Sequence, residues 1–312
     1  MNDLFGLISR RNLIFCRKYN MSLCLIAIFK NESHILKEWI THYLNQGVEK
    51  FFLIDNGSKD NYFPIIKPFI KKNFIYLVRD IKPHSQIELY NKYFVNLCKK
   101  YKWAILCDLD EFIYAKNGFN KISEYLQDIN NYRNISLIFI PWKVFGSNGY
   151  NTLNKPQPES VIKSFTKRLN YDRYRPFKEL FIKENNHIFT YTKCIIKTNY
   201  LLKLDIHEHK MLPEFNNYYN FITTYNNINN IHKNRAFSKI NENIICSSIL
   251  NLNHYCIQSL DFYSRVKMIR NDAVYVKNDR TLKLFNKYDN NCNEIDDYEL
   301  SEISNNYMSY DL

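Results

Sequence analysis

The chain has 312 residues, of which 46% are hydrophobic and 24% charged, so it is long enough to bury one large core. Lysine and arginine exceed aspartate and glutamate by 43 − 31 = 12, which favours anionic ligands without choosing among nucleotide, nucleic acid and membrane. No apolar run reaches the roughly 18 residues of a membrane-spanning helix, and no dense arginine run is present. We therefore expect a protein that does not span a membrane and binds no nucleic acid.

The first twenty residues form a basic N-terminal segment. A short apolar stretch precedes Arg10, Arg11, Arg17 and Lys18, which is the reverse of the order in a secretory signal peptide. We expect neither a signal peptide nor a membrane anchor here. Peripheral contact with an anionic membrane remains an alternative for this segment.

The eight cysteines show no C-x-x-C spacing, and Cys24 and Cys107 lie within apolar runs. This usage is typical of reduced, buried thiols and argues against a zinc site. We therefore expect a cytoplasmic location.

Strand and helix patterns alternate through the first 110 residues. Apolar runs predict strands at 22–29, 50–54, 74–78 and from Trp103, and helical spacing predicts helices from 33 to Gly47, from Pro64, and over 85–100. Such alternation predicts an α/β fold with a mostly parallel sheet flanked by helices. We expect the strand at 50–54 to lie beside the strand from Trp103.

The second half is less regular. A helix is predicted at 122–129 and a central strand at 135–141, whereas 142–158, 161–197 and 214–234 indicate an irregular lobe over the ligand edge of the sheet. Ser259 is predicted to cap a helix that places Phe262, Val266, Ile269 and Ala273 on one face.

The domain boundaries follow from these patterns. We expect a basic segment at 1–20, one domain at 21–277, and an exposed acidic tail at 278–312, because no lysine or arginine follows Lys287. Within the domain, we expect a first half at about 21–115 and a second half at about 116–277.

The strand from Trp103 ends in three acids, Asp108, Asp110 and Glu111. Ligands of parallel sheets bind at the carboxyl ends of the strands. Alternation along a strand would point Asp108 and Asp110 to the same side, where two carboxylates can share a divalent cation that holds a diphosphate. The pattern predicts metal-assisted chemistry on a nucleotide, although an Asp-x-Asp pair on solvated surface is the alternative.

Two further polar motifs follow predicted strands. Asp55 at the end of the second strand can accept a hydrogen bond from a base or ribose, or can belong to a turn. Asn31 and Glu32 after the first strand can face the same crevice or cap the next helix. Three such motifs in one order predict a nucleotide pocket above the sheet.

These motifs resemble a known family. The positions that carry the resemblance begin with Asn31-Glu32, Leu36, Glu38-Trp39-Ile40, His42-Tyr43, Gly47-Val48, Phe51 and Asp55-Asn56-x-Ser58-x-Asp60. They continue with Gln86, Tyr90, Cys98, Trp103, Asp108 to Phe112, Trp142, Phe145 to Tyr150, Lys178, His207, Leu252 to Tyr255, Ser259 and Lys267. Over residues 22–270 the chain resembles glycosyltransferases of the GT-A fold in families 2 and 92.

The resemblance implies roles for individual residues. Asp55 would read the base, Asp108 would contact ribose or metal, and Asp110 would bind the metal, Mn²⁺ or Mg²⁺. His254 would complete the metal shell, with His207 and His209 as rivals. The remaining donor-side residues would be Asn31, Glu32, Asn56, Ser58 and Gln86, and the catalytic set would be Asp108, Asp110 and Glu111.

The acceptor side is expected around Trp142, Gly146, Ser147, His207 and Glu208. Asn148, Tyr150 and Glu179 depart from the family pattern there and leave the acceptor open. The general base remains open among Glu159, Asp205 and Glu208.

The resemblance implies transfer of a hexose from a nucleotide-diphosphate sugar, such as a UDP-sugar, to a glycan or lipid-linked acceptor, with inversion. A nucleotidyltransferase is one alternative, although the glycine- and arginine-rich phosphate loop that would follow its first strand is missing. A non-enzymatic basic protein that binds nucleic acid or membranes is the other, but it leaves the acids at three strand ends unexplained.

Overall fold

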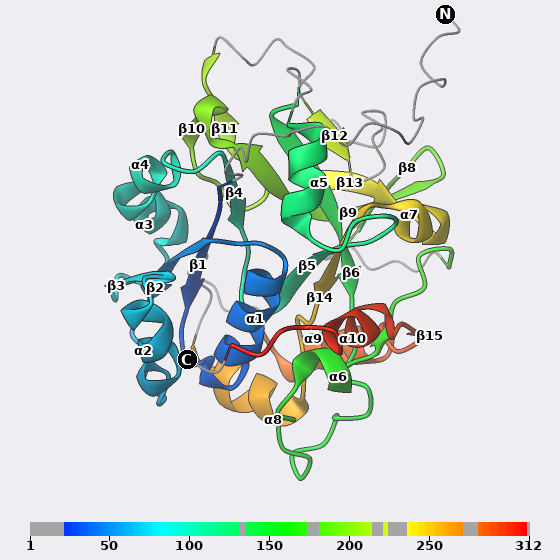
Figure 1. Cartoon of the computed structure of the whole chain (residues 1–312). Coiled ribbons are helices and arrows are strands. Elements are labelled where there is room, and N and C mark those ends of the chain that lie inside the picture. Colours follow the sequence, from blue (N-terminus) through cyan, green and yellow to red (C-terminus); the bar gives the residue numbers. More distant parts are fainter. Residues whose placement is uncertain are drawn as a thin grey trace, which may run out of the picture.

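The computed structural model describes residues 22–130, 135–173, 181–213, 221–223, 236–270 and 280–310. Its N-terminal half is a parallel layer in the order β3-β2-β1-β4, formed by β1 (Leu23–Phe29), β2 (Lys50–Asp55), β3 (Ile75–Arg79) and β4 (Trp103–Leu106) (Figure 1). All seven residues of β1 are buried, as expected for a central strand covered on both faces. The predicted alternation of strands and helices is confirmed.

The expected neighbour of β4 was wrong. β1 lies between β2 and β4 and pairs in parallel with both, so the end of β2 is one strand further from the acids than we predicted. The reason is that the chain winds outward from β1 in both directions, which the strand order along the sequence does not reveal.

Helices α1 (Ser33–Asn45), α2 (Phe63–Lys71), α3 (Gln86–Tyr93) and α4 (Val95–Cys98) connect these strands. The predicted helix over 85–100 is divided at Phe94, whose φ of −120° interrupts the helix. Gly47 ends the turn after α1 with a φ of +88°, and a Cβ there would lie 2.0 Å from Ser123 Oγ. Only glycine allows both the positive φ and the close approach to Ser123.

The sheet continues from β4 through β9 (His187–Lys197), β6 (Leu137–Val144), β14 (Leu250–His254) and β5 (Glu111–Ala115). β9 is antiparallel to both β4 and β6 and lies in the middle of the sheet. Assigning this segment to an irregular lobe was therefore wrong. The α/β fold with a largely parallel sheet is confirmed in its first half, whereas the second half is mixed.

Shorter elements complete the described chain. They are α5 (Ile122–Ile129), α6 (Val161–Ser164), β7 (Lys167–Arg168), β8 (Phe181–Glu184), β10 (Leu201–Lys203), β11 (Lys210–Met211), β12 (Phe221–Thr223), β13 (Phe237–Ile240), α7 (Glu242–Ser247), α8 (Leu260–Phe262), α9 (Leu282–Asp289), β15 (Ile295–Asp296) and α10 (Glu299–Ser304). None of the described helices combines the length and apolarity needed to cross a bilayer.

Ser259 caps α8 as predicted, since its hydroxyl accepts a hydrogen bond from the backbone N–H of Phe262. The chain then continues as a π-helical turn, Tyr263–Lys267. Ile269 is 71% exposed, so its predicted place on the inward face was wrong; the wider turn shifts the later side chains around the axis. Ala273 lies outside the described residues.

The acidic tail packs against the domain over residues 280–310, so its expected exposure was wrong there. β15 pairs with β7, and Leu300 of α10 is buried. Asp297 accepts a hydrogen bond at 2.9 Å from Lys143 and one at 2.6 Å from Arg168. The cationic side chains that pair with the acids of the tail lie earlier in the chain. The composition of the tail alone therefore does not reveal them.

Candidate functional site

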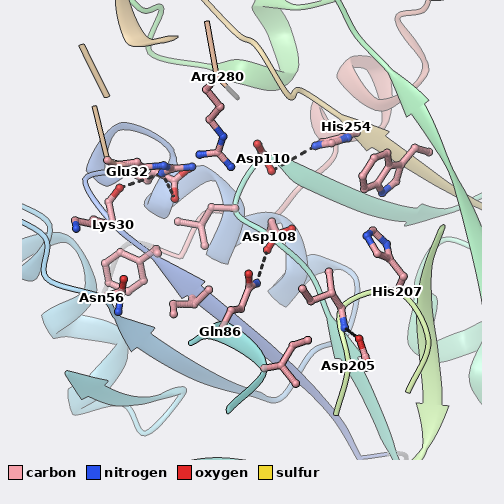
Figure 2. A pocket seen from close by; sticks show the side chains of 17 residues that line it. Lys30, Glu32, Asn56, Gln86, Asp108, Asp110, Asp205, His207, His254 and Arg280 are labelled. Atoms are coloured by element: carbon pink, nitrogen blue, oxygen red, sulfur yellow. Dashed lines mark hydrogen bonds and ion pairs between the residues drawn. The ribbon is translucent and has the colours of Figure 1, made fainter. Parts of the chain in front are cut away.

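A cavity of about 360 Å³ opens at the carboxyl ends of β1 and β4 (Figure 2). The predicted residues that line it are Glu32, Asn56, Gln86, Asp108, Asp110, Trp142, Asp205, His207 and His254. The structure thus brings together side chains from the loops after β1, β2 and β4 with side chains of β6 and β14. The three strand-end motifs of the sequence predict a pocket above the sheet, and the cavity lies there.

Asp108 and Asp110 lie in the turn between β4 and β5, not on a strand as the alternation argument assumed. Glu111 begins β5 and is fully buried, and its carboxylate accepts a hydrogen bond at 2.9 Å from the backbone N–H of Asp108. Burial raises the pKa of Glu111 to about 8. Glu111 therefore stabilises the turn that carries Asp108 and Asp110. It does not line the cavity, although its predicted catalytic role would require that position.

The carboxylate of Asp108 forms an ion pair with Lys193, a fully buried residue of β9. Lys193 Nζ lies 2.8 Å from one oxygen of Asp108 and 3.4 Å from Glu111. Burial opposes the ionisation of Asp108, but Lys193 more than offsets it and holds the pKa of Asp108 below its usual value. The other oxygen of Asp108 accepts a hydrogen bond at 3.3 Å from Gln86.

Asp110 has a similar arrangement. Its Oδ2 accepts a hydrogen bond from the buried Lys267, while its Oδ1 lies 3.7 Å from His254 Nε2. Burial opposes the charge on Asp110, yet Lys267 and His254 keep its pKa low. Burial also lowers the pKa of His254 to about 4. An ionised carboxylate therefore faces a neutral imidazole.

This pair fits a divalent cation. Oδ1 of Asp110 and Nε2 of His254 are separated by 3.7 Å, close enough for both atoms to reach one ion. Among the described residues, no group of three or more histidine, cysteine or acidic side chains is gathered as a metal cage. Mg²⁺ is commonly held by one or two carboxylates while phosphate and water complete its shell.

Cationic side chains also line the cavity. Lys30, Arg270 and Arg280 are among the lining residues, and Figure 2 shows Arg280 directed toward Asp110. Arg270 forms an ion pair of 2.8 Å with Glu32 and donates a hydrogen bond of 3.0 Å to the carbonyl of Lys30. Glu32 thus orients an arginine, which its strand-end position did not predict.

Asp55 and its neighbours form a hydrogen-bonded turn. Asp55 is fully buried and accepts hydrogen bonds from the Ser58 backbone N–H at 2.7 Å, from the Tyr62 hydroxyl at 2.8 Å, and from Arg79. Asp55 does not line the cavity. Its proposed contact with the base stays a prediction, and the described contacts are those of the turn alternative.

Asn31 and Asn56 extend this turn toward the cavity. Asn31 has a φ of +57°, its backbone N–H donates to Ser58 Oγ at 3.0 Å, and its side chain accepts from Lys59 N–H at 2.7 Å. Asn56 donates at 2.7 Å to the carbonyl of Asp80, and it lines the cavity. The hydrogen bonds of Asn31 fix the loops after β1 and β2 against each other, and that of Asn56 joins the loop after β2 to the loop after β3.

The predicted acceptor-side residues divide into two groups. Trp142 and His207 line the cavity, and the Trp142 ring lies 4.2 Å from that of His254 and 5.5 Å from that of His207. Gly146 and Ser147 lie away from it: Ser147 Oγ donates to Asp289 at 2.5 Å, and a Cβ on Gly146 would lie 2.3 Å from Asn293.

The three candidate general bases lie in different places. Asp205 lines the cavity, whereas Glu208 does not and Glu159 lines a different groove between α1 and α6. His209, the second rival metal ligand, is buried outside the cavity lining and accepts a hydrogen bond of 3.1 Å from the Asp205 backbone. Lys178 and Glu179 lie outside the described residues.

Lys193, Arg270 and Arg280 were missed from the sequence. A signal existed for Lys193, because a lysine followed by Cys194, Ile195 and Ile196 interrupts an apolar run and requires a buried partner. Arg270 and Arg280 follow the last recognised motif, and no local pattern distinguishes them from surface residues.

The protein is an α/β protein with a cavity at the carboxyl edge of its parallel strands, which is where such folds bind their ligands. The model of glycosyltransferase family 92 matches residues 19–283, and the chain belongs to this family. The family predicted from the sequence is thereby confirmed.

Two plant proteins of family 92 are similar to this chain. The protein of Ricinus communis is 24% identical over 131 residues, which cover 41% of this chain and 23% of that protein. The protein of Oryza sativa subsp. japonica is 23% identical over 155 residues, which cover 49% and 26%. The matched region spans about a quarter of each relative.

Some solved structures are similar to part of this chain. S. aureus TarS 1–349 in complex with UDP is 13% identical, with a TM-score of 0.32, over 57% of this chain and 47% of that chain. GalNAc-T7 with UDP, GalNAc and Mn²⁺ is 10% identical, with a TM-score of 0.30, over 57% and 35%.

Proposed function

We propose that this protein is a metal-dependent glycosyltransferase that moves a hexose from a nucleotide-diphosphate sugar, a UDP-sugar in our proposal, to a glycan or lipid-linked acceptor. The observation that carries the proposal is the pair Asp110 and His254, whose ligand atoms face each other at 3.7 Å in the cavity wall. Membership of family 92 supports the reaction class.

The residues divide the work according to their positions. Asp110 and His254 would hold Mn²⁺ or Mg²⁺, with Asp108 beside them. The cation, when bound, would neutralise the charge that develops on the leaving diphosphate. Lys30 and Arg280 line the same cavity and would bind the phosphate oxygens. Asn56, which follows β2, and Gln86, which begins α3 and donates a hydrogen bond to Asp108, would contact the nucleoside.

Asp205 is the general base in this proposal. Asp205 and His207 lie on the side of the cavity away from Lys30 and Asn56 (Figure 2). From there the Asp205 carboxylate would take the proton of the acceptor hydroxyl as its oxygen bonds to the anomeric carbon and the diphosphate leaves. A single displacement of this kind inverts the anomeric centre. Trp142, on the same side, would form the wall against the sugar.

A screen of nucleotide sugars tests the proposal. The full chain is incubated with each donor, with Mn²⁺ or with a chelator, and release of nucleoside diphosphate is measured beside the thermal shift. We expect one donor class to give Mn²⁺-dependent release. Release of pyrophosphate from a nucleoside triphosphate and a sugar phosphate would instead support the nucleotidyltransferase alternative. A chain that responds to no nucleotide would contradict both.

A further inference from the structure

The motif that follows β6 is predicted on the acceptor side, but its contacts are with the C-terminal tail. The backbone N–H and the hydroxyl of Ser147 donate to Asp289 Oδ1 at 3.1 and 2.5 Å. The Asn148 backbone N–H donates at 2.9 Å to Asn293 Oδ1, and the Asn293 amide donates at 2.7 Å to Asp289 Oδ1. We call Gly146, Ser147, Asp289 and Asn293 the tail anchor.

The tail anchor is buried and closely packed. Asp289 is 9% exposed, and its second oxygen accepts a hydrogen bond at 3.2 Å from Asn151, so both of its oxygens have donors. A Cβ on Gly146 would lie 2.3 Å from Asn293 Oδ1 and 2.6 Å from the carbonyl oxygen of Cys292. A buried carboxylate with hydrogen bonds to both oxygens fixes the groups around it, so the end of α9 is held in one position.

Phe145 connects the tail anchor to the candidate metal site. Its backbone N–H donates at 3.0 Å to the carbonyl of His254, where β6 and β14 pair in parallel. The imidazole of the same His254 faces Asp110 at 3.7 Å. Backbone hydrogen bonds of the sheet therefore set the position of the anchor relative to Asp110 and His254.

Helix α9 joins the anchor to an arginine of the donor cavity. Asp289 is the last residue of α9, and Arg280 directly precedes Thr281, whose hydroxyl caps its first turn. The 8 residues of this helix span about 12 Å. Phe285 in its middle is fully buried and packs against Tyr263, with 5.2 Å between the ring centroids. A short, packed helix thus transmits the position of Asp289 to Arg280.

Arg280 reaches the cavity from the start of α9. It lines the cavity, and Figure 2 shows its side chain directed toward Asp110. Burial raises the pKa of Tyr263, and the charge of Arg280 partly opposes this rise, so the guanidinium also lies near the Tyr263 hydroxyl. A guanidinium binds phosphate oxygens with two parallel hydrogen bonds, and such a contact requires that its plane is well placed.

We propose that Asp289 is a positioning residue for the donor diphosphate: by holding α9 against Ser147, it keeps Arg280 where the phosphates bind. The inference rests on the proposed function and adds to it a residue that does not line the cavity. Without the anchor, α9 keeps its contact with Tyr263 but its end is no longer fixed. Binding the diphosphate would then also have to order Arg280, which weakens affinity.

Calorimetry of the full chain with UDP and with uridine, both in the presence of Mn²⁺, tests this inference. Arg280→Gln should weaken UDP binding roughly 10- to 100-fold and leave uridine binding unchanged, because only UDP carries phosphates. Asp289→Ala should show the same selective loss, of roughly threefold or more. The double variant Arg280→Gln/Asp289→Ala should bind UDP no more weakly than Arg280→Gln alone, because Asp289 acts through Arg280.

The matched control is Asp296→Ala, which removes another carboxylate of the tail. Asp296 lies in β15, outside α9, and is 55% exposed, so UDP binding should be unchanged. Ser147→Ala breaks the tail anchor from the other side and should also weaken UDP binding selectively. It keeps the test decisive if thermal unfolding shows that Asp289→Ala does not fold.

Three results would overturn the inference while the proposed function stands. They are unchanged UDP binding in a folded anchor variant, equal losses for UDP and uridine, and a loss in the double variant that is the sum of the two single losses. The last two would mean that Asp289 supports the fold without acting through Arg280. If the unchanged protein binds no UDP, the proposed function itself is contradicted, and this inference falls with it.

Discussion

Asp110 and His254 face each other with 3.7 Å between Oδ1 and Nε2, although 144 positions separate them along the chain (254 − 110). β5, which follows the acid-bearing turn, pairs antiparallel with β14, and His254 lies opposite Glu111 in that register. Lys267 binds the other oxygen of Asp110, so only Oδ1 remains directed at the imidazole. The sheet itself therefore builds the candidate metal site.

Replacing Asp205 should slow chemistry without weakening donor binding. Because Asp205 would take the acceptor proton, we expect Asp205→Asn to reduce turnover by about 10²- to 10⁴-fold. Steady-state kinetics and calorimetry with UDP measure the two effects separately. Glu159→Gln is the control, because Glu159 lines a different groove, and it should leave turnover unchanged. The reverse result, with Glu159 essential and Asp205 dispensable, would remove Asp205 as the base.

Replacing Asp55 should first affect stability. Asp55→Ala leaves the Ser58 N–H, the Tyr62 hydroxyl and Arg79 without their shared acceptor. The two buried donors, on Ser58 and Tyr62, cost about 1–3 kcal/mol each in the free energy of unfolding, which chemical denaturation measures, whereas Arg79 is 54% exposed and can be hydrated. Weaker UDP binding at unchanged stability would contradict this account and would support the base-reading role predicted from the sequence.

Acid should destabilise the protein through His42. Its Nε2 donates to the Ile113 carbonyl at 2.7 Å, its Nδ1 accepts from the Tyr307 hydroxyl at 2.9 Å, and burial lowers its pKa to about 3. In the unfolded chain, His42 binds a proton near pH 6.5, whereas in the folded protein it stays neutral down to about pH 3. Its contribution to the free energy of unfolding is therefore present above pH 6.5 and is lost as the pH falls toward 3. The slope is up to about 1.4 kcal/mol per pH unit.

The variant His42→Gln isolates this contribution, because glutamine does not titrate. Denaturation curves are measured at several pH values. Between pH 6.5 and 3, the free energy of unfolding should fall less steeply for His42→Gln than for the unchanged protein. Parallel curves would mean that His42 is not the group responsible.

The C-terminal tail should contribute to folding through Asp297. Asp297 is 7% exposed in its side chain and pairs with the buried Lys143 and Arg168, so Asp297→Asn removes one of the carboxylates that balance them, while Glu299 near Lys143 and Glu242 beside Arg168 remain. Breaking a buried pair on one side costs about 3–5 kcal/mol, which is the upper bound here because these partners remain. Asp296→Asn is the control, since Asp296 is 55% exposed and its partner Lys167 is 44% exposed. Equal stability of the two variants would show that the tail is dispensable.

The sequence predicted the first half of the fold because local patterns determine it. Apolar runs and helical spacing marked β1 to β4 and α1 to α3, and the strand-end acids marked the cavity. β9 was misread, because its partners β4 and β6 are distant in sequence and its run contains polar residues such as Lys193. Whether Asp110 meets His254 depends on the register of β14 against β5, and whether Lys193 reaches Asp108 depends on the pairing of β9 with β4. Local spacing carries no information about either pairing.

Calorimetric titration with UDP, in the presence and absence of Mn²⁺, tests the central claim most directly. Asp110→Asn and His254→Gln are compared with the unchanged protein, and thermal unfolding confirms that each is folded. His254→Gln is the cleaner variant, since it leaves the Asp110–Lys267 pair in place. We predict that Mn²⁺ strengthens UDP binding and that both variants abolish this gain, with turnover reduced about 10²- to 10³-fold. Mn²⁺-independent binding that is equal in all three proteins would contradict the account.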